Sequence, residues 1–336
     1  MSDERFAGVD LGGTNVRVGI TSRDDQLLAF TATSLDAALG AAAGLNRIGD
    51  LIEAARREAG DLALSGIGLG ISGPLDIATG RIANRHSLTG WEALDVRGLL
   101  EQRFALPITF ENDTDAAAIG EWRAGAGRGA DVLAMVTLGT GVGVAVLSGG
   151  QPRRGAGWSH AEAGHLVVDP SGPACYCGAS GCWEAFAAGT ALALAARRSG
   201  DPALAGADAP AVVRLARAGN AAAAAILDAA TRALTLGLGN VIAAFAPDAI
   251  VLGGGASSAY VDRLDGIRAA LRRRLSYLPP GSVRISAAEL GDRAGVIGAA
   301  ASARQAAQGV PHPDSEGPAG GGPAAGDKGK ERSDVR

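Results

Sequence analysis

Residues 6–20 read FAGVDLGGTNVRVGI, and this stretch decides the fold. Apolar residues lie on both sides of a glycine-rich turn, which predicts two β-strands joined as a hairpin. The hexapeptide Asp10-Leu11-Gly12-Gly13-Thr14-Asn15 places a carboxylate at a strand end, beside glycines whose backbone N–H groups can approach an anion closely. These residues therefore predict a phosphate-binding turn, and an ordinary hairpin turn is the alternative for the hexapeptide alone.

A second hairpin is predicted where residues 132–138 and 142–147 flank Gly139-Thr140-Gly141. Aligned with the first hairpin, it forms a weak internal repeat, which indicates two similar halves built around glycine-rich turns. Residues 132–151 are uncharged and long enough for a membrane span, but two strands joined by a turn explain their Gly, Ser and Thr content better.

Strand and helix patterns alternate along the rest of the chain, which indicates α/β layers. We expect further strands at 27–33, 67–71, 108–110, 249–252 and 283–286, and helices at 45–58, 94–104, 116–121, 183–198, 209–218, 221–245, 261–275 and 294–306. From residue 309 onward the chain is Gly, Pro, Ala and charged residues with almost nothing to bury, which predicts a disordered tail.

The length, composition and net charge of the chain exclude some classes of protein. The chain has 336 residues, enough for about two domains, and 47% of them are hydrophobic. Its 31 Lys and Arg against 35 Asp and Glu leave a net charge of −4, which argues against a basic nucleic-acid-binding protein. The acidic start lacks an apolar run that would act as a signal peptide, so we expect a cytoplasmic protein without a membrane partner.

The three cysteines, Cys175, Cys177 and Cys182, lie within eight residues of one another. With His165 they supply the four nitrogen and sulfur ligands that tetrahedral Zn²⁺ prefers, so a structural zinc site is predicted, with three buried structural cysteines as the alternative. The second ring nitrogen of His165 would then remain free to hydrogen-bond a substrate.

Two glutamates and a further histidine flank this cluster. Glu162 and Glu184 could accept hydrogen bonds from adjacent sugar hydroxyls, or they could be solvated surface charges. No partner is evident for His160, which we interpret as part of a loop.

Glu111-Asn112-Asp113 lies where a strand ends and a helix begins, a position from which a carboxylate can face a cleft. Asp113 could be the helix N-cap. Alternatively it is a general base that takes the proton from a sugar hydroxyl, while Asn112 holds the sugar by its amide.

A third glycine-rich segment, Gly253-Gly254-Gly255, follows a buried strand, and a flat ring could rest on its bare backbone. Neither a P-loop lysine motif nor a G-x-G-x-x-G after a strand occurs, so any nucleotide site has another architecture.

In combination these motifs resemble the ROK family of sugar kinases, within the actin-like ATPase and hexokinase clan, over about residues 6–305. The three glycine-rich segments define only the clan. The family's own signature is Ala161-Glu162-Ala163-Gly164-His165 followed by Cys175-x-Cys177-Gly178-x-x-Gly181-Cys182-x-Glu184. Ala161, Ala163 and Asp115 depart from the residues usual in the family.

The resemblance implies a two-lobed actin-like ATPase (ribonuclease H-like) fold with an interdomain cleft and a zinc knuckle. Residues 1–118 would form a small α/β lobe on which the helix 292–306 packs back. Residues 119–291 would form a large α/β lobe, and 307–336 a disordered tail. The family usually forms homodimers, so a homodimer is the expected assembly.

The resemblance also implies ATP-dependent phosphorylation of a hexose, with the 6-hydroxyl of glucose as the first choice. Asp113 would be the catalytic base and Mg²⁺ would bridge phosphates near Asp10. ATP would contact the three glycine-rich segments. The sugar-binding residues would be Asn112, Asp113, Glu162, His165 and Glu184. His165 would also be a zinc ligand. Gly73 and Ser87 would lie on the remaining loops of the sugar site.

Several alternatives remain open at this stage. N-acetylglucosamine, N-acetylmannosamine and fructose are possible substrates, because loop shape decides whether an N-acetyl group fits. Polyphosphate could replace ATP. The family also contains sugar-responsive repressors with an N-terminal helix-turn-helix, whereas here the phosphate turn begins at Asp10.

Overall fold

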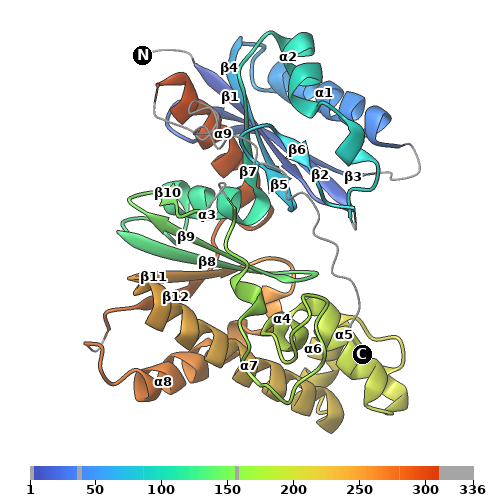
Figure 1. Cartoon of the computed structure of the whole chain (residues 1–336), viewed down its shortest axis with the longest axis vertical. Helices are drawn as coiled ribbons and strands as arrows, with labels where there is room; N and C mark the ends of the chain where they lie inside the picture. The colour runs from blue at the N-terminus through green and yellow to red at the C-terminus, as the bar shows by residue number, and fades with distance from the viewer. Residues whose placement is uncertain (1–3, 36–39, 86, 156–158, 280, 310–336) are drawn as a thin grey trace, which may run out of the picture.

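The computed structural model of the chain describes residues 4–35, 40–85, 87–155, 159–279 and 281–309. Residues 310–336 of the predicted tail lie outside this part. Two five-stranded sheets organise the described residues (Figure 1). The first sheet has the order β3-β2-β1-β4-β7, and the second has the order β10-β9-β8-β11-β12.

The two sheets share one topology. β1 pairs antiparallel with β2 and parallel with β4, and β8 likewise pairs antiparallel with β9 and parallel with β11. The weak sequence repeat therefore corresponds to two similar sheets. The strands are β1 (Arg5–Leu11), β2 (Asn15–Ser22), β3 (Leu27–Ser34), β4 (Leu64–Ile71), β7 (Ile108–Asn112), β8 (Val132–Leu138), β9 (Val142–Ser148), β10 (Gln151–Pro152), β11 (Ala249–Gly253) and β12 (Arg284–Ala287), with a small hairpin of β5 (Leu75–Asp76) and β6 (Arg81–Ile82).

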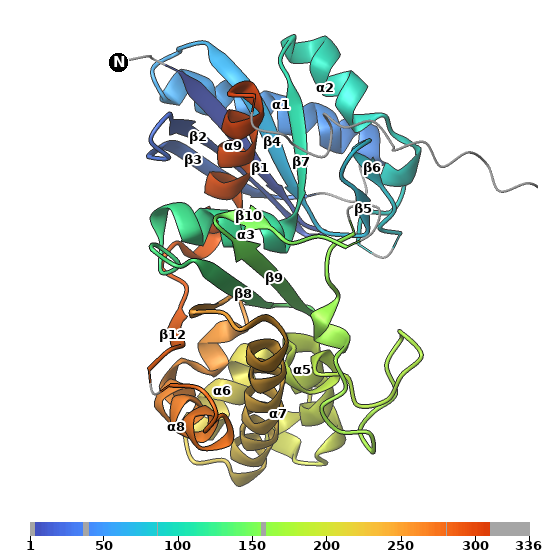
Figure 2. The same ribbon diagram turned by 60° about the vertical axis from the view of Figure 1, so that its left-hand side comes forward.

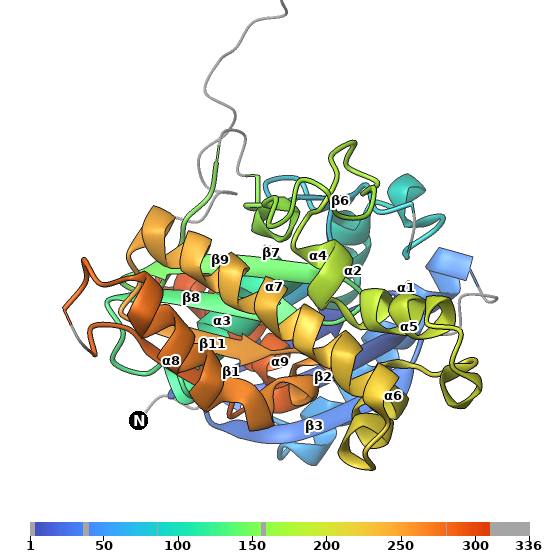
Figure 3. The same ribbon diagram turned by 90° about the horizontal axis from the view of Figure 1, so that it is seen from below.

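Helices cover both sheets and join them. One face of the first sheet packs against α1 and α2, and the other packs against α9, which contacts α3 on the second sheet (Figures 1 and 2). Helices α4 to α8 cover the far face of the second sheet (Figure 3). The helices are α1 (Gly40–Glu58), α2 (Val96–Phe104), α3 (Asp113–Ala124), α4 (Glu184–Ala187), α5 (Gly189–Arg198), α6 (Ala209–Arg217), α7 (Ala221–Phe245), α8 (Leu264–Arg274) and α9 (Ala294–Ala307).

The single helix predicted at 183–198 is instead two helices. The chain is extended at Ala188, which ends α4 and caps α5. The backbone N–H of Gly189 donates to the carbonyl of Gly139 at 2.8 Å, so α5 begins against the second glycine-rich turn. This long-range contact interrupts a sequence whose local pattern is helical throughout.

Two segments meet composition criteria for a membrane span. The uncharged stretch 132–151 forms β8 and β9, so the two strands predicted there are confirmed. Among the described residues, α7 is the one helix that is long and apolar enough to cross a membrane. Its Leu234, Leu238 and Val241 are buried in the core beneath the second sheet, and core helices of this composition are common.

The contact of α9 with its neighbours depends on glycine. A Cβ atom on Gly298 would overlap the carbonyl oxygen of Ala116 in α3, and one on Gly8 of β1 would overlap the carbonyl oxygen of Val296. These backbones therefore lie closer together than any larger residue permits. The many small residues of the chain thus allow close packing of α9 against its neighbours.

We expect Gly298→Ala to lower the free energy of unfolding by about 1–3 kcal/mol, because α3 and α9 must separate to admit a methyl group. Gly266→Ala is the matched control, since a Cβ at this exposed helical position meets nothing within 4 Å. It should stabilise the protein by about 0.5–1 kcal/mol. Denaturant unfolding of both variants provides the measurement, and equal effects would contradict the close-packing account.

Candidate functional site

Each glycine-rich turn is closed by a hydrogen bond from its first glycine to the residue that precedes the first residue pair of the next strand in the hairpin, although the second turn is one residue shorter. Gly12 N–H donates to the carbonyl of Asn15 at 3.0 Å, and Gly139 N–H donates to the carbonyl of Gly141 at 2.9 Å. Because the sheets share one topology, the turns occupy equivalent strand ends. Successive backbone N–H groups in such turns can bind an anion.

The third glycine-rich segment lies against the second turn. Ala256 N–H donates to the carbonyl of Leu138 at 2.8 Å, and a Cβ on Gly254 would overlap the backbone of Leu138. Gly139 and Gly255 have open space where a Cβ would lie. The structure thus brings the two predicted nucleotide-binding segments, 139–141 and 253–255, together. At Gly139 and Gly255 no other atom covers the backbone on the side where a side chain would lie.

Ser87 lies beside the first turn. A Cβ on Gly13 would overlap the Ser87 side chain, and Ser87 Oγ accepts a hydrogen bond from Asn84 Nδ2 at 2.6 Å. Ser87 therefore lies next to the predicted phosphate turn. Gly73 lies on another loop, where a Cβ would come within 3.2 Å of Asn112 Nδ2.

Asp10 is the penultimate residue of β1, close to the first turn, and 18% of its side chain is exposed. Arg17 Nη1 donates to its Oδ2 at 3.1 Å. Burial, with the charge of Asp113 as the next cause, raises the pKa of Asp10 to about 6, although Arg17 opposes the shift. Asp10 and Asp113 are thus electrostatically coupled carboxylates, a combination that a divalent cation would stabilise.

The N-cap of α3 is Asn112, which corrects the alternative that gave this place to Asp113. Asn112 Oδ1 accepts from the backbone N–H of Thr114 at 2.8 Å and of Asp115 at 3.4 Å. Asp113 is the first residue of the helix, where the helix dipole favours a carboxylate. Because Asn112 caps the helix, the carboxylate of Asp113 is not needed for that purpose.

Ser72 donates to Asp113 and was missed in the sequence, although it lies next to Gly73. Its Oγ is 2.6 Å from Asp113 Oδ2, while Asp113 Oδ1 accepts from Thr114 N–H at 2.8 Å. These bonds fix the orientation of the carboxylate. Two strands, β4 and β7, thus deliver Ser72 and Asp113 to the same edge of the first sheet.

The cysteine and histidine side chains converge as predicted. Cys175 Sγ is 3.4 Å from His165 Nδ1, Cys177 Sγ is 3.5 Å from Cys182 Sγ, and the four ligand atoms all lie within 4.8 Å of one another. Ligands at Zn²⁺ bond lengths in a tetrahedron are about 3.5–3.8 Å apart. The cluster therefore fits a zinc ion.

The thiols of Cys182 and Cys177 differ in the direction of their pKa shifts. Burial and the neighbouring thiols raise the pKa of Cys182 to about 12, whereas hydrogen bonds, first from the Ala179 backbone, lower the pKa of Cys177. A metal ion would favour both thiolates, because coordination deprotonates a thiol outright.

The second ring nitrogen of His165 is not free, contrary to the sequence-based expectation. Its Nε2 is 2.9 Å from the hydroxyl of Tyr176, whose side chain is otherwise exposed. Desolvation of that hydroxyl, followed by the carboxylates of Glu184 and Glu162, raises the pKa of Tyr176 to about 12. The hydroxyl of Tyr176 thus contacts His165 and lies within the electrostatic influence of Glu184 and Glu162.

Glu184 connects this group to the second turn. Its Oε2 accepts from the backbone N–H of Val142 at 2.9 Å, and a Cβ on Gly141 would overlap it. The predicted sugar-binding and nucleotide-binding residues thus adjoin at the start of α4.

A buried ionic cluster lies behind Asp113. Asp115 contacts both His160 and Arg154, and Arg154 also pairs with Glu111. His160 lies in a loop, as predicted from the sequence, but it has a partner in Asp115, which the sequence did not reveal. No local pattern connects residues 45 positions apart, so the only available signal was the unusual Asp115 itself.

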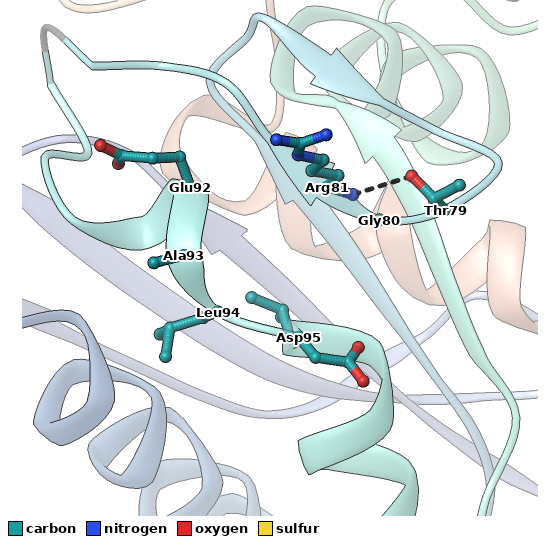
Figure 4. A pocket seen from close by; sticks show the side chains of 8 residues that line it. Thr79, Gly80, Arg81, Glu92, Ala93, Leu94 and Asp95 are labelled. Atoms are coloured by element: carbon teal, nitrogen blue, oxygen red, sulfur yellow. Dashed lines mark hydrogen bonds between the residues drawn. The ribbon is translucent and has the colours of Figure 1, made fainter.

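Two surface pockets lie away from this site. One pocket is lined by Thr79, Gly80, Arg81 and residues 92–96, beside the hairpin of β5 and β6 (Figure 4). Another lies between α8 and β12. Neither includes a predicted site residue, so the site is defined by strand ends and converging side chains.

Comparisons with known proteins match these features. Residues 6–306 match the ROK family. The chain is 31% identical to a glucokinase of Thermotoga maritima, over 88% of this chain and 96% of the relative, and 31% identical to an N-acetylmannosamine kinase of Escherichia coli, over 87% and 96%.

Solved structures give the same result. The ROK hexokinase from Thermus thermophilus superposes with a TM-score of 0.81 at 34% identity, covering 91% of this chain and 99% of that one. A ROK family glucokinase from Streptomyces griseus in complex with glucose and AMPPNP gives 0.73 at 33% identity, covering 90% and 99%. Both similarities extend over the two sheets and the helices between them.

We expect purified protein to contain about one zinc ion per chain, because the four ligands satisfy tetrahedral coordination. Cys177→Ala should lose most of the metal and lower the melting temperature. Ser180→Ala, in the same loop, is the control and should retain zinc. Elemental analysis with a thiol titration provides the measurement. A fully folded wild-type protein without metal would contradict the zinc site.

Proposed function

This chain belongs to the ROK family, and from that membership we propose that it is a sugar kinase that transfers the γ-phosphoryl group of ATP to the 6-hydroxyl of glucose. Glucokinases about 31% identical over most of the chain support the kinase activity. The related structure with glucose and AMPPNP supports the use of ATP and a sugar.

One structural observation carries the proposal. Asp113 begins α3 at the edge of the first sheet, held by Ser72, and its charge acts on Asp10 beside the first glycine-rich turn. A base and a phosphate-binding turn at one edge are what transfer from a nucleotide to a hydroxyl requires.

In the proposed mechanism, Asp113 takes the proton of the attacking hydroxyl. Asn112 through its amide, Glu162, His165 and Glu184 bind the other sugar hydroxyls and orient the nucleophile. The glycine-rich segments bind ATP by backbone N–H groups. Mg²⁺ near Asp10 would neutralise phosphate charge when bound. Closure of the two halves over the sugar would exclude water, which competes as acceptor.

A second substrate class has support in the comparisons. N-acetylmannosamine kinases match at the same 31% identity as the glucokinases, over a similar share of the chain. Both use the same fold, so only the room around the 2-position of the sugar distinguishes the two proposals.

The first test is ADP release with Mg-ATP over glucose, N-acetylglucosamine, N-acetylmannosamine, mannose and fructose. We expect glucose to have the highest kcat/KM, and Asp113→Asn to lower kcat by about 10²–10⁴, the range for loss of a general base. Asp262→Asn, which alters an exposed pair with Arg217, should leave kcat unchanged.

The outcomes separate the parts of the proposal. A preference for an N-acetylhexosamine would retain the mechanism and change the substrate. Near-normal turnover by Asp113→Asn would overturn the assignment of the base. If no sugar releases ADP, the kinase proposal fails.

The pKa of about 6 for Asp10 gives a further prediction. The carboxylate is ionised above this pH and protonated below it, and only the ionised form attracts Mg²⁺. The KM for Mg-ATP should therefore rise by up to about tenfold per unit as the pH falls below 6.

Steady-state kinetics between pH 5 and 8 measure this dependence, with the fold checked at each pH by circular dichroism. Asp10→Asn should raise the KM for Mg-ATP at pH 7.5 and remove its pH dependence. A wild-type KM that does not change across this range would refute the role given to Asp10.

A further inference from the structure

His160 and Asp115 form a buried pair that the proposed mechanism does not use. His160 Nδ1 is 3.1 Å from Asp115 Oδ1, and the other carboxylate oxygen accepts from Arg154 Nε at 3.4 Å. The side chain of Asp115 is 2% exposed and that of His160 is 13% exposed. Water therefore screens this contact far less than a surface pair.

The pair bridges segments that are far apart in sequence. Asp115 lies in the first turn of α3, two residues after Asp113. His160 lies in the loop that follows β10, two residues before Glu162. The contact thus joins the helix that carries the proposed base to the loop that carries proposed sugar-binding groups.

The same cluster is anchored to the last helix. Arg154 pairs with Glu111 at the end of β7, and Glu111 Oε1 accepts from Ser302 Oγ of α9 at 2.9 Å. Asp115 is therefore held on a rigid base of strand and helices, so its partner His160 is fixed relative to Asp113.

Glu162 lies between two attachment points of its loop. On one side His165 belongs to the cysteine cluster, and on the other His160 contacts Asp115. Glu162 itself is exposed and cannot be positioned by burial. Removal of either attachment would allow its carboxylate to move relative to the sugar.

The charged groups around His160 favour its cationic form. Asp113 and Asp115 face it from α3, Glu162 faces it from its own loop, and Arg154 lies on the far side of Asp115. Burial, the largest single cause, lowers the pKa of His160, but the hydrogen bond and charge of Asp115 together with the charges of Glu162 and Asp113 raise it overall. An imidazolium donating to a carboxylate makes a strong, charge-assisted hydrogen bond.

We infer that His160 is a positioning residue for sugar binding: by donating to Asp115, it holds the loop of Glu162 and His165 at a fixed distance from Asp113. The inference rests on the proposed function, because it assigns these groups to the sugar. It adds a residue that does not touch the substrate and acts through the loop.

The test compares His160→Ala with His160→Asn, whose amide can place a donor near the position of Nδ1. His160→Ala should raise the KM for the best sugar by about tenfold, with the KM for Mg-ATP and kcat within about twofold. His160→Asn should restore most of the sugar affinity. Arg153→Ala, an exposed cation on the same loop, is the control and should resemble the wild type.

A pH profile distinguishes positioning from a general structural role. The positive charge that strengthens this hydrogen bond is present below the raised pKa of His160 and is lost as the pH rises through it, which leaves the weaker hydrogen bond of a neutral ring. The wild-type KM for sugar should therefore rise on the alkaline side. This rise should be absent in His160→Asn, whose amide does not titrate.

Sugar dissociation constants from tryptophan fluorescence, measured without ATP, separate this inference from the kinase proposal. Weaker sugar binding by His160→Ala at unchanged melting temperature supports it, even if turnover has another substrate order. Unchanged sugar binding overturns it. An equal rise in the KM for sugar and for Mg-ATP also overturns it, because that pattern indicates a general loss of structure.

Discussion

The close approach of α3 and α9 is the constraint on which the rest of the structure depends. Gly298 places the backbone of α9 directly against Ala116 of α3, and Gly8 places it against β1. The first sheet and the second sheet are joined through this pair of helices. Because Asp113 begins α3 and Asp10 lies near the end of β1, the same packing also determines how far apart the two carboxylates lie. Small residues at the helix contact are therefore a requirement of the proposed site as well as of the core.

Asn112 and Asp113 have separate roles at the start of α3, and this leaves the carboxylate of Asp113 available. Asn112 satisfies the first backbone N–H groups of α3, so Asp113 retains an oxygen that Ser72 alone orients. At Asp10, burial is the largest cause of a pKa raised to about 6. Carboxylates near the ends of β1 and β7, the strands on either side of β4, can thus have different roles.

Local patterns in the sequence predicted most of the fold. The hairpins around the two glycine-rich turns, the long helix at 221–245 and the convergence of His165 with the three cysteines all follow from residues near one another in sequence. The break at Ala188 could not be predicted, because its cause is a contact with Gly139. The partners Asp115 and His160, and the contact of Tyr176 with His165, were missed for the same reason: tertiary contacts leave no periodicity. The roles of the site residues remain proposals.

The position of α9 has a consequence for biosynthesis. This helix is the last described element of the chain, yet it covers one face of the first sheet, whose strands are made first. A ribosome that has synthesised β1 to β7 has therefore released a sheet with one face still open to water. That face stays uncovered until α9 has been translated, a period in which exposed strands are prone to aggregate. Gly8 and Gly68 lie on this face in place of larger apolar side chains, which reduces the apolar surface exposed during that delay.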